Sequence, residues 1–247
     1  MNNLLKNKKI LIADYGRSGQ GWLSYMLCYY LNARFIEPYD LLRGRLYSSS
    51  DMILKTTEGD LPLREKTAYD LVIKTHEYPA ADFKLTNKVI ILTRDPKDVA
   101  VSAFNRYKNL SKKENPRSLK EAISMLIYSF RFTSYMMTAY KWSKYYSAWK
   151  NISAYTTSYE KLITDPTNTL KNILNYLEVK IDESLINETI EKYSFENITG
   201  RKRGEEAQDN SEFRKGIIGD YKNHFNSIEL YFFNNICGNE MKHFSYD

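Results

Sequence analysis

The chain has 247 residues, 43% of them hydrophobic and 27% charged, which is an ordinary balance for a globular protein rather than a disordered one. No apolar run approaches the roughly 20 residues that cross a bilayer, so we expect no membrane span. The formal net charge of +6 favours an anionic partner, which could be nucleic acid, an anionic lipid surface or a highly phosphorylated small molecule.

The first half of the chain predicts strands that alternate with helices. Short aliphatic runs, typical of buried parallel strands, occupy Ile10–Ala13, Asp70–Lys74 and Lys88–Thr93. Apolar residues recur at helical spacing from about Trp22 to Asn32. Asp95 and Pro96 form a usual helix start, and we expect a helix to follow them.

The second half continues the alternation. Helical spacing extends from Ser118 to about Trp149, a fourth strand is predicted at 152–156, and Asp165–Pro166 begins another helix. The charged stretch 197–213 has no period and is predicted to be a long surface loop. Strands separated by helices predict a single α/β domain over residues 1–247, with a central parallel sheet flanked by helices.

A glycine-rich turn follows the first strand. Gly16 and Gly21 have the spacing of the phosphate-binding loop G-x-x-x-x-G-K-[S/T], in which backbone N–H groups and a helix N-terminus bind an anion. Trp22 and Leu23 replace the lysine and the Mg²⁺-binding hydroxyl of that loop, and Arg17 supplies a cation instead. The turn therefore predicts a P-loop-like phosphate or sulfate site that needs no metal, although glycines of this kind also make plain strand-to-helix turns.

Four further segments complete a recognisable constellation. They are Lys74–His76, Thr93–Ser102, Tyr159–Leu162 and Arg214–Phe225. In this order they resemble the sulfotransferases that use 3′-phosphoadenosine 5′-phosphosulfate (PAPS), particularly the cytosolic type. The resemblance extends from about Lys9 to Phe225, and the segments R-D-P-K-D-V-A-V-S and R-K-G-x-x-G-D-Y-K-N-x-F are its most specific parts.

The resemblance implies a set of donor-binding residues. For the 5′-phosphosulfate it implies the loop residues Arg17, Ser18, Gly19, Gln20, Gly21 and Trp22, with Arg17 in place of the family's lysine and Gln20 and Gly21 in place of two threonines. For the 3′-phosphate it implies Arg94, Ser102, Arg214, Lys215 and Gly216. For the adenine it implies Trp22, Tyr159 and Phe195, with Tyr193 ranked below Phe195. Arg94 and Arg214 could alternatively be surface arginines in ordinary ion pairs, and the aromatic residues could simply be core.

Three residues are catalytic candidates: Lys74, His76 and Arg17. The resemblance implies that Arg17 acts on the leaving oxygen. Lys74 and His76 are two residues apart at the end of a predicted strand, so their side chains share one side, whereas Glu77 faces the other. Ligands of parallel sheets bind at the carboxyl ends of strands. We assign His76 as general base and Lys74 as a stabiliser of charge on the transferred group.

The predicted reaction moves a sulfuryl group from PAPS to a hydroxyl, or in second place an amine, of a small-molecule, glycan or lipid acceptor, and releases adenosine 3′,5′-bisphosphate (PAP). Segments 37–64, 107–117 and 197–213 are the expected walls and lid of the acceptor pocket. The aromatic helix Tyr140–Trp149 would suit a flat or sugar-like acceptor, but core packing explains it equally well. Neither the acceptor nor the oligomeric state is readable from the sequence.

Three other functions compete with this prediction. Basic charge and 21 tyrosines would suit a module that binds single-stranded nucleic acid or a nucleotide without catalysis, but we expect no nucleic-acid partner. A nucleotide kinase would need a Mg²⁺-binding hydroxyl in place of Leu23, and a catalytically silent relative would not need Lys74 or His76. Cys28 and Cys237 have no metal-ligand spacing and no secretory leader is recognisable, so we expect a cytoplasmic protein without a metal site.

Overall fold

The computed structural model describes residues 8–36, 67–79, 86–110, 129–207 and 213–246, together with four single positions between 119 and 126. The chain divides into two compact units, the first formed by residues 1–93 and 152–198 and the second by residues 94–151 and 199–247. The prediction of a single domain stays a prediction. Of the expected acceptor-pocket segments, all of 37–64, residues 111–117 and residues 208–212 lie outside the described residues.

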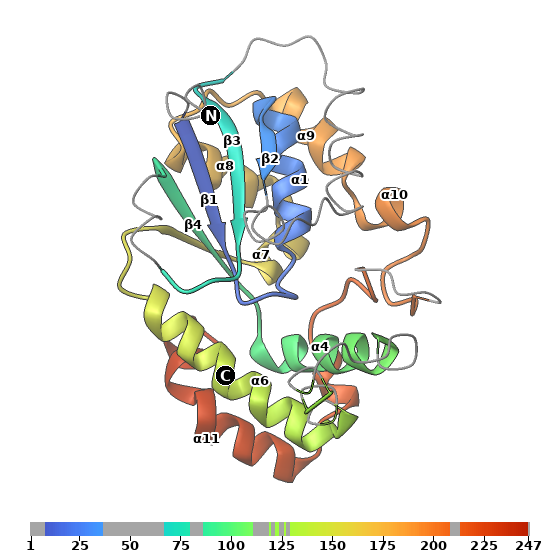
Figure 1. The fold of residues 1–247 in the computed structure, drawn as a ribbon. Coiled ribbons are helices and arrows are strands. Elements are labelled where there is room, and N and C mark those ends of the chain that lie inside the picture. The colour runs from blue at the N-terminus through green and yellow to red at the C-terminus, as the bar shows by residue number, and fades with distance from the viewer. Residues whose placement is uncertain are drawn as a thin grey trace. The chain divides into compact units, whose positions relative to one another are not determined.

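The first unit is built on a parallel sheet. In its described part the strands are β1 (Lys8–Ala13), β2 (Arg34–Ile36), β3 (Tyr69–Thr75), β4 (Lys88–Thr93) and β5 (Tyr155–Ser158). Their order is β2-β3-β1-β4-β5, and every neighbouring pair is parallel. The carboxyl ends of the strands consequently lie at one edge of the sheet, as the arrowheads in Figure 1 show. Ile10 and Ile12 of the central strand are fully buried.

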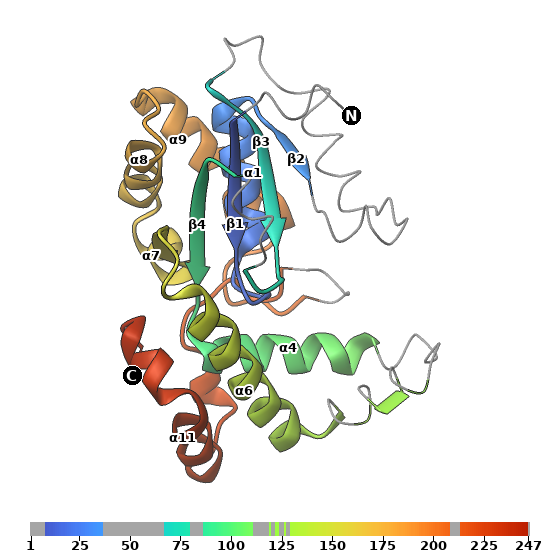
Figure 2. The ribbon, with the colours of Figure 1, turned by 60° about the vertical axis from the view of Figure 1, so that its left-hand side comes forward.

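Helices cover one face of this sheet. They are α1 (Gln20–Leu31), α7 (Tyr159–Thr164), α8 (Pro166–Tyr176) and α9 (Glu183–Lys192), and the short α10 (Phe195–Thr199) follows α9 in the chain. Leu23 and Leu27 of α1 are fully buried, and α1 packs against β3 and α9 (Figure 2). Tyr30 fixes the contact between α1 and α9. Its hydroxyl donates to the Lys180 carbonyl at 3.0 Å and accepts from the Asp182 N–H at 2.8 Å.

The second unit is helical in its described part. Its elements are α4 (Pro96–Leu110), α6 (Arg131–Trp149), the 3₁₀ helix η2 (Asp220–Asn223) and α11 (Ser227–His243). Helices α6 and α11 lie side by side in Figures 1 and 2, and α4 packs against α6. Trp142, Tyr146 and Trp149 of α6 are almost completely buried, so core packing accounts for these three residues, whereas Tyr140 is 53% exposed.

The alternation of strands and helices that the sequence predicts is confirmed, with differences at the element ends. The fourth predicted strand begins three residues later and ends two residues later, at Tyr155–Ser158, and the predicted loop 197–213 begins inside α10. Residues 118–128 of the predicted long helix fall mostly outside the described residues. Asp165 caps α8 as expected, because its carboxylate accepts the Asn168 N–H at 3.2 Å. No described helix has both the length and the apolar character of a membrane span.

Candidate functional site

The glycine-rich turn connects β1 to α1 at the carboxyl edge of the sheet. Gly16, Arg17 and Gly19 have φ angles of 102°, 60° and 87°, so three residues of this short turn lie in the left-handed region. Backbone turns of this kind form concave nests of N–H groups that bind anions. Gly19 is the N-cap of α1 and makes no side-chain capping bond, which leaves the first N–H groups of the helix available to a ligand.

Aromatic rings enclose this turn from the side of α7. A Cβ built on Gly19 would lie 2.6 Å from Cδ2 of Tyr159, so the Tyr159 ring rests directly on the Gly19 backbone. The Trp22 and Tyr159 rings meet edge to face at 6.3 Å, and Trp22 Nε1 donates to the Tyr193 carbonyl at 2.6 Å. Phe195 is buried at the start of α10. The structure therefore brings Trp22 and Tyr159 together, and their contact with adenine stays a prediction.

Two polar loop residues use their side chains within the protein. Gln20 Nε2 donates to the Ile12 carbonyl and, at 3.4 Å, to the Thr75 carbonyl, which joins the ends of β1 and β3. Ser18 is fully buried, and its hydroxyl donates to the Gly16 carbonyl at 3.4 Å. Gln20 can therefore reach a donor only through its backbone N–H, and the predicted donor contacts of both residues stay predictions.

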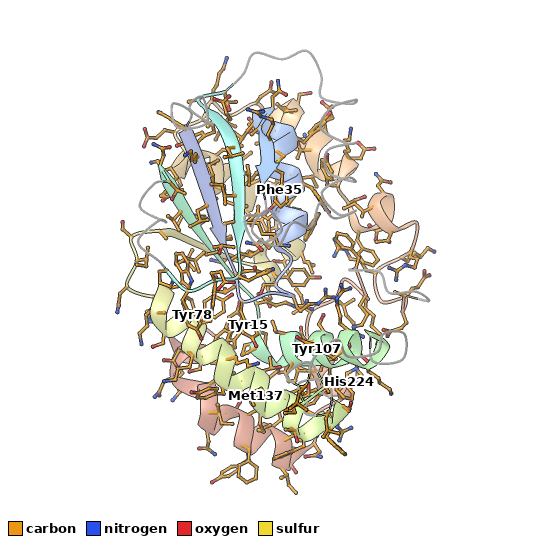
Figure 3. The ribbon with its side chains drawn as sticks, viewed as in Figure 1. Tyr15, Phe35, Tyr78, Tyr107, Met137 and His224 are labelled. Carbon is orange, nitrogen blue, oxygen red and sulfur yellow. The ribbon has the colours of Figure 1, made fainter. Side chains whose placement is uncertain are left out.

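His76 lies at the same edge, one residue beyond the end of β3. A Cβ built on Gly16 would lie 3.8 Å from both Cε1 and Nδ1 of His76, so the imidazole adjoins the glycine-rich turn. Tyr15 and Tyr78, labelled in Figure 3, mark this edge beyond β1 and β3. Lys74, inside β3, pairs in register with Ile12 of β1. The structure thus places His76 beside the predicted phosphosulfate loop and Lys74 two residues before it, in β3.

The imidazole of His76 is held by Asp14, the first residue after β1. His76 Nδ1 lies 2.7 Å from Asp14 Oδ1 and 3.0 Å from the Asp14 carbonyl oxygen. Asp14 is completely buried, whereas 42% of the His76 side chain is exposed. Burial lowers the pKa of His76, but the Asp14 carboxylate more than compensates, so the pKa lies above its usual value.

In the second unit, Arg94 begins a cluster of buried charge. Arg94 is 8% exposed, and its Nη2 donates to the Ile217 carbonyl at 3.3 Å. Asp98, in the first turn of α4, accepts hydrogen bonds from the backbone N–H groups of Gly219 and Tyr221 at 2.7 and 2.9 Å. These bonds attach the start of α4 to the segment that follows Gly216. Ser102 is buried two turns into α4.

Arg214 and Lys215 share two carboxylates. Both donate to the buried carboxylate of Asp220, with Lys215 Nζ 3.2 Å from Oδ1, and both also lie within 3.3 Å of the exposed carboxylate of Glu206. Burial raises the pKa of Asp220, but the bonds from Arg214, Asn223 and Lys215 hold it well below its usual range. The two predicted phosphate-binding cations are consequently fixed in position by their own unit.

Three buried carboxylates contact the candidate residues His76, Arg94, Arg214 and Lys215, and they were not predicted as site residues. They are Asp14, Asp98 and Asp220, each at most 1% exposed. Asp98 and Asp220 stand inside the two specific motifs, so they could have been found there. Asp14 had only one signal, a charged residue directly after a buried strand.

Comparisons with known proteins are consistent with this arrangement. The sequence model described as the sulfotransferase domain matches residues 7–245. Human sulfotransferase 2A1 is 24% identical over 242 residues, covering 90% of this chain and 80% of its own length. Mouse sulfotransferase 1E1 is 28% identical over 245 residues, covering 90% of this chain and 79% of its own.

Solved structures show the same fold. The crystal structure of mouse sulfotransferase SULT7A1 complexed with PAP has a TM-score of 0.61 and 19% identity, covering 95% of this chain and 84% of that one. Retinol dehydratase in complex with androsterone and the inactive cofactor PAP also has a TM-score of 0.61, with 18% identity, and covers 95% and 80% of the two chains.

Proposed function

The chain belongs to the sulfotransferase domain family, and on this premise we propose that it transfers a sulfuryl group from PAPS to an acceptor hydroxyl and releases PAP. The single observation that supports this most strongly is the position of the His76 imidazole beside Gly16 of the glycine-rich turn. A base next to an anion-binding loop is what transfer from an anionic donor to a hydroxyl requires.

The turn and its neighbours would bind the 5′ end of the donor. The backbone N–H groups from Arg17 to Gly21 would hold the phosphosulfate, and the Trp22 and Tyr159 rings would contact the adenine. Arg17 would stabilise charge on the oxygen that leaves sulfur, as a planar guanidinium in place of a compact ammonium. A sulfuryl group carries fewer negative oxygens than a phosphoryl group, so Arg17 and Lys74 would supply the charge that a metal gives in kinases.

The 3′-phosphate would bind residues of the second unit. Arg94, Ser102, Arg214, Lys215 and the Gly216 backbone are our proposed ligands. The arginines and Lys215 are held by buried carboxylates, so little side-chain freedom is lost when they bind an anion. Charge-assisted bonds of this kind typically contribute about 1.5–3 kcal/mol each.

The reaction is an in-line transfer. The acceptor oxygen attacks sulfur, the bond from sulfur to the 5′-phosphate oxygen breaks, and the acceptor proton passes to His76. The acceptor would be a small molecule, a glycan or a lipid, with a hydroxyl ahead of an amine. Cys28 and Cys237 are both buried free thiols, which fits a reducing cytoplasm.

The proposal is tested by transfer from radiolabelled PAPS to a panel of acceptor alcohols and amines. We expect His76→Ala to lower turnover by about 10²–10⁴-fold while PAP still binds, because the variant loses only the proton acceptor. His243→Ala, on α11, is the matched control and should keep normal turnover. Near-normal turnover of His76→Ala would remove His76 from its role, and a protein that binds no PAP would refute PAPS as donor.

A further inference from the structure

The pairing of Asp14 with His76 goes beyond the residues assigned so far. The two lie 62 positions apart in the chain, and adjacent parallel strands bring them together, since Asp14 follows β1 and His76 follows β3. The Asp14 N–H also donates to the Thr75 carbonyl at 3.2 Å, which fixes the backbone on both sides of the pair. The pairing of β1 with β3 therefore sets the relative position of Asp14 and His76.

The carboxylate of Asp14 depends on this partner. It is completely buried, and burying an ionised carboxylate is costly unless a charged or hydrogen-bonding group compensates it. Within the described part of the chain, no group makes a hydrogen bond of normal geometry to either carboxylate oxygen. The His76 ring, at 2.7 Å, is the group that faces this charge.

The two atoms opposite His76 Nδ1 determine which ring nitrogen carries the proton. A backbone carbonyl oxygen can only accept a hydrogen bond, and an ionised carboxylate also only accepts. Nδ1 therefore holds the hydrogen in the neutral imidazole, and the lone pair lies on Nε2. We propose that Asp14 is a positioning residue for the general base: it orients the His76 ring, keeps Nε2 unprotonated, and stabilises the imidazolium that forms when Nε2 takes the acceptor proton. This inference rests on the proposed function of His76.

Two charged side chains act on this ring in opposite senses. Asp14, at the end of β1, raises the pKa of His76, and Lys74, on β3, lowers it. Because the carboxylate favours the protonated ring, it also favours the state that His76 reaches during transfer. Asp14 thus favours proton transfer to His76 more strongly than a neutral residue at this position would.

The first test follows the titration of His76 by NMR in the protein without nucleotide. The chain has three histidines, so the His76→Ala spectrum identifies the C2 proton of His76. We expect Asp14→Asn, which keeps the size of the side chain and removes its charge, to lower the pKa of His76. Lys74→Met should raise it. Asp70→Asn, the same change at the start of β3, should leave the titration unchanged.

The second readout is the pH profile of transfer. His76 accepts a proton only when neutral, so a lower pKa should move the acidic limb of kcat/KM to lower pH in Asp14→Asn. We also expect kcat to fall by about 10- to 100-fold, less than for loss of the base itself. A merely structural role for Asp14 would change stability without moving this limb.

A measurement on the unaltered protein covers the case in which Asp14→Asn does not fold. The ¹⁵N shifts of neutral His76 should report hydrogen on Nδ1, and hydrogen on Nε2 would overturn the inference. An unchanged His76 titration in folded Asp14→Asn would overturn it as well. If Asp14→Asn moves the titration but His76→Ala keeps full turnover, the pairing stands and the proposed role of His76 as base is wrong.

Discussion

Arg214 and Lys215 are each paired with one buried and one exposed carboxylate, and the two carboxylates have different consequences for anion binding. Asp220 is 1% exposed and bonds both cations, so a ligand cannot displace it and it acts as a fixed support. Glu206 is 56% exposed and lies on the same two cations at 3.2 and 3.3 Å. An incoming phosphate would compete with Glu206 and not with Asp220.

Glu206→Gln should therefore tighten PAP binding. Exposed salt bridges are worth only about 0–1 kcal/mol, so we expect the dissociation constant to fall by about 2- to 5-fold, measured by isothermal titration calorimetry. Glu205→Gln is the matched control, because its neighbouring carboxylate bonds the Lys202 N–H instead, and it should bind PAP as the unaltered protein does. Weaker binding by Glu206→Gln would mean that Glu206 orients the cations rather than competing for them.

Asp220, unlike Glu206, is buried, and it contributes to the stability of the folded protein. Its pKa is held below the usual range in the folded protein, so its contribution to stability is present above the unfolded pKa of about 4 and is lost as the pH falls through the folded value. Asp220 thus stabilises the second unit at neutral pH, together with the two cations that we propose as donor ligands.

Among the elements, the turn before α1 shows most clearly how backbone conformation constrains the site. Gly19 has φ +87° and supports the Tyr159 ring, so an alanine there meets two separate obstacles: an unfavourable φ and a contact of 2.6 Å. Gly200 also has a positive φ, of +67°, but a Cβ there would meet nothing within 4 Å.

The comparison of Gly19→Ala with Gly200→Ala separates these two effects. Both variants carry the backbone strain, but only Gly19→Ala forces the Tyr159 ring away from the turn. We expect Gly19→Ala to lose about 1–3 kcal/mol more of unfolding free energy than Gly200→Ala, measured by chemical denaturation, and to bind PAP more weakly. Equal losses in the two variants would show that the Tyr159 ring yields freely and does not brace the turn.

The sequence predicts the elements whose pattern is local. Aliphatic runs predict β1, β3 and β4, and Asp165 with Pro166 predicts α8, because burial and helix capping depend on a few consecutive residues. The predicted bounds of the strand Tyr155–Ser158 differ from the structure because no aliphatic run marks this strand. Only its register with β4 defines it. The glycine-rich loop, Lys74 and His76 are likewise predicted from short motifs of a few consecutive residues.

The contacts that hold the site residues in position are harder to predict from the sequence than the motif residues themselves. Asp14 contacts a residue 62 positions away, and Asp98 contacts residues more than 120 positions away. No spacing or period in the sequence connects such partners, since the fold alone brings them together. The motifs contain Asp98 and Asp220, but the groups that these carboxylates hold become visible only when the strands and helices are placed.

For the molecule as a whole, the net charge of +6 favours anions of every kind, so charge alone does not distinguish a nucleotide donor from a nucleic acid. The distinguishing chemistry is the 3′-phosphate, for which we propose Arg94, Arg214 and Lys215 as ligands, each beside a buried carboxylate. A protein that binds nucleic acid through charge and stacking would have no need of a terminal phosphate at that position.

Thermal unfolding with PAP and with adenosine 5′-monophosphate tests this difference. A ligand at 100 times its dissociation constant stabilises the folded state by about 2.7 kcal/mol, so at equal concentration PAP should raise the unfolding midpoint clearly more than the monophosphate does. Arg94→Ala should reduce that difference, because the buried guanidinium beside Asp98 is lost while the glycine-rich turn is intact. Lys171→Ala, a surface cation paired with Glu183 in the first unit, should keep it. Equal midpoints for the two nucleotides in the unaltered protein, together with tight binding of a single-stranded oligonucleotide, would favour the nucleic-acid module over the transferase.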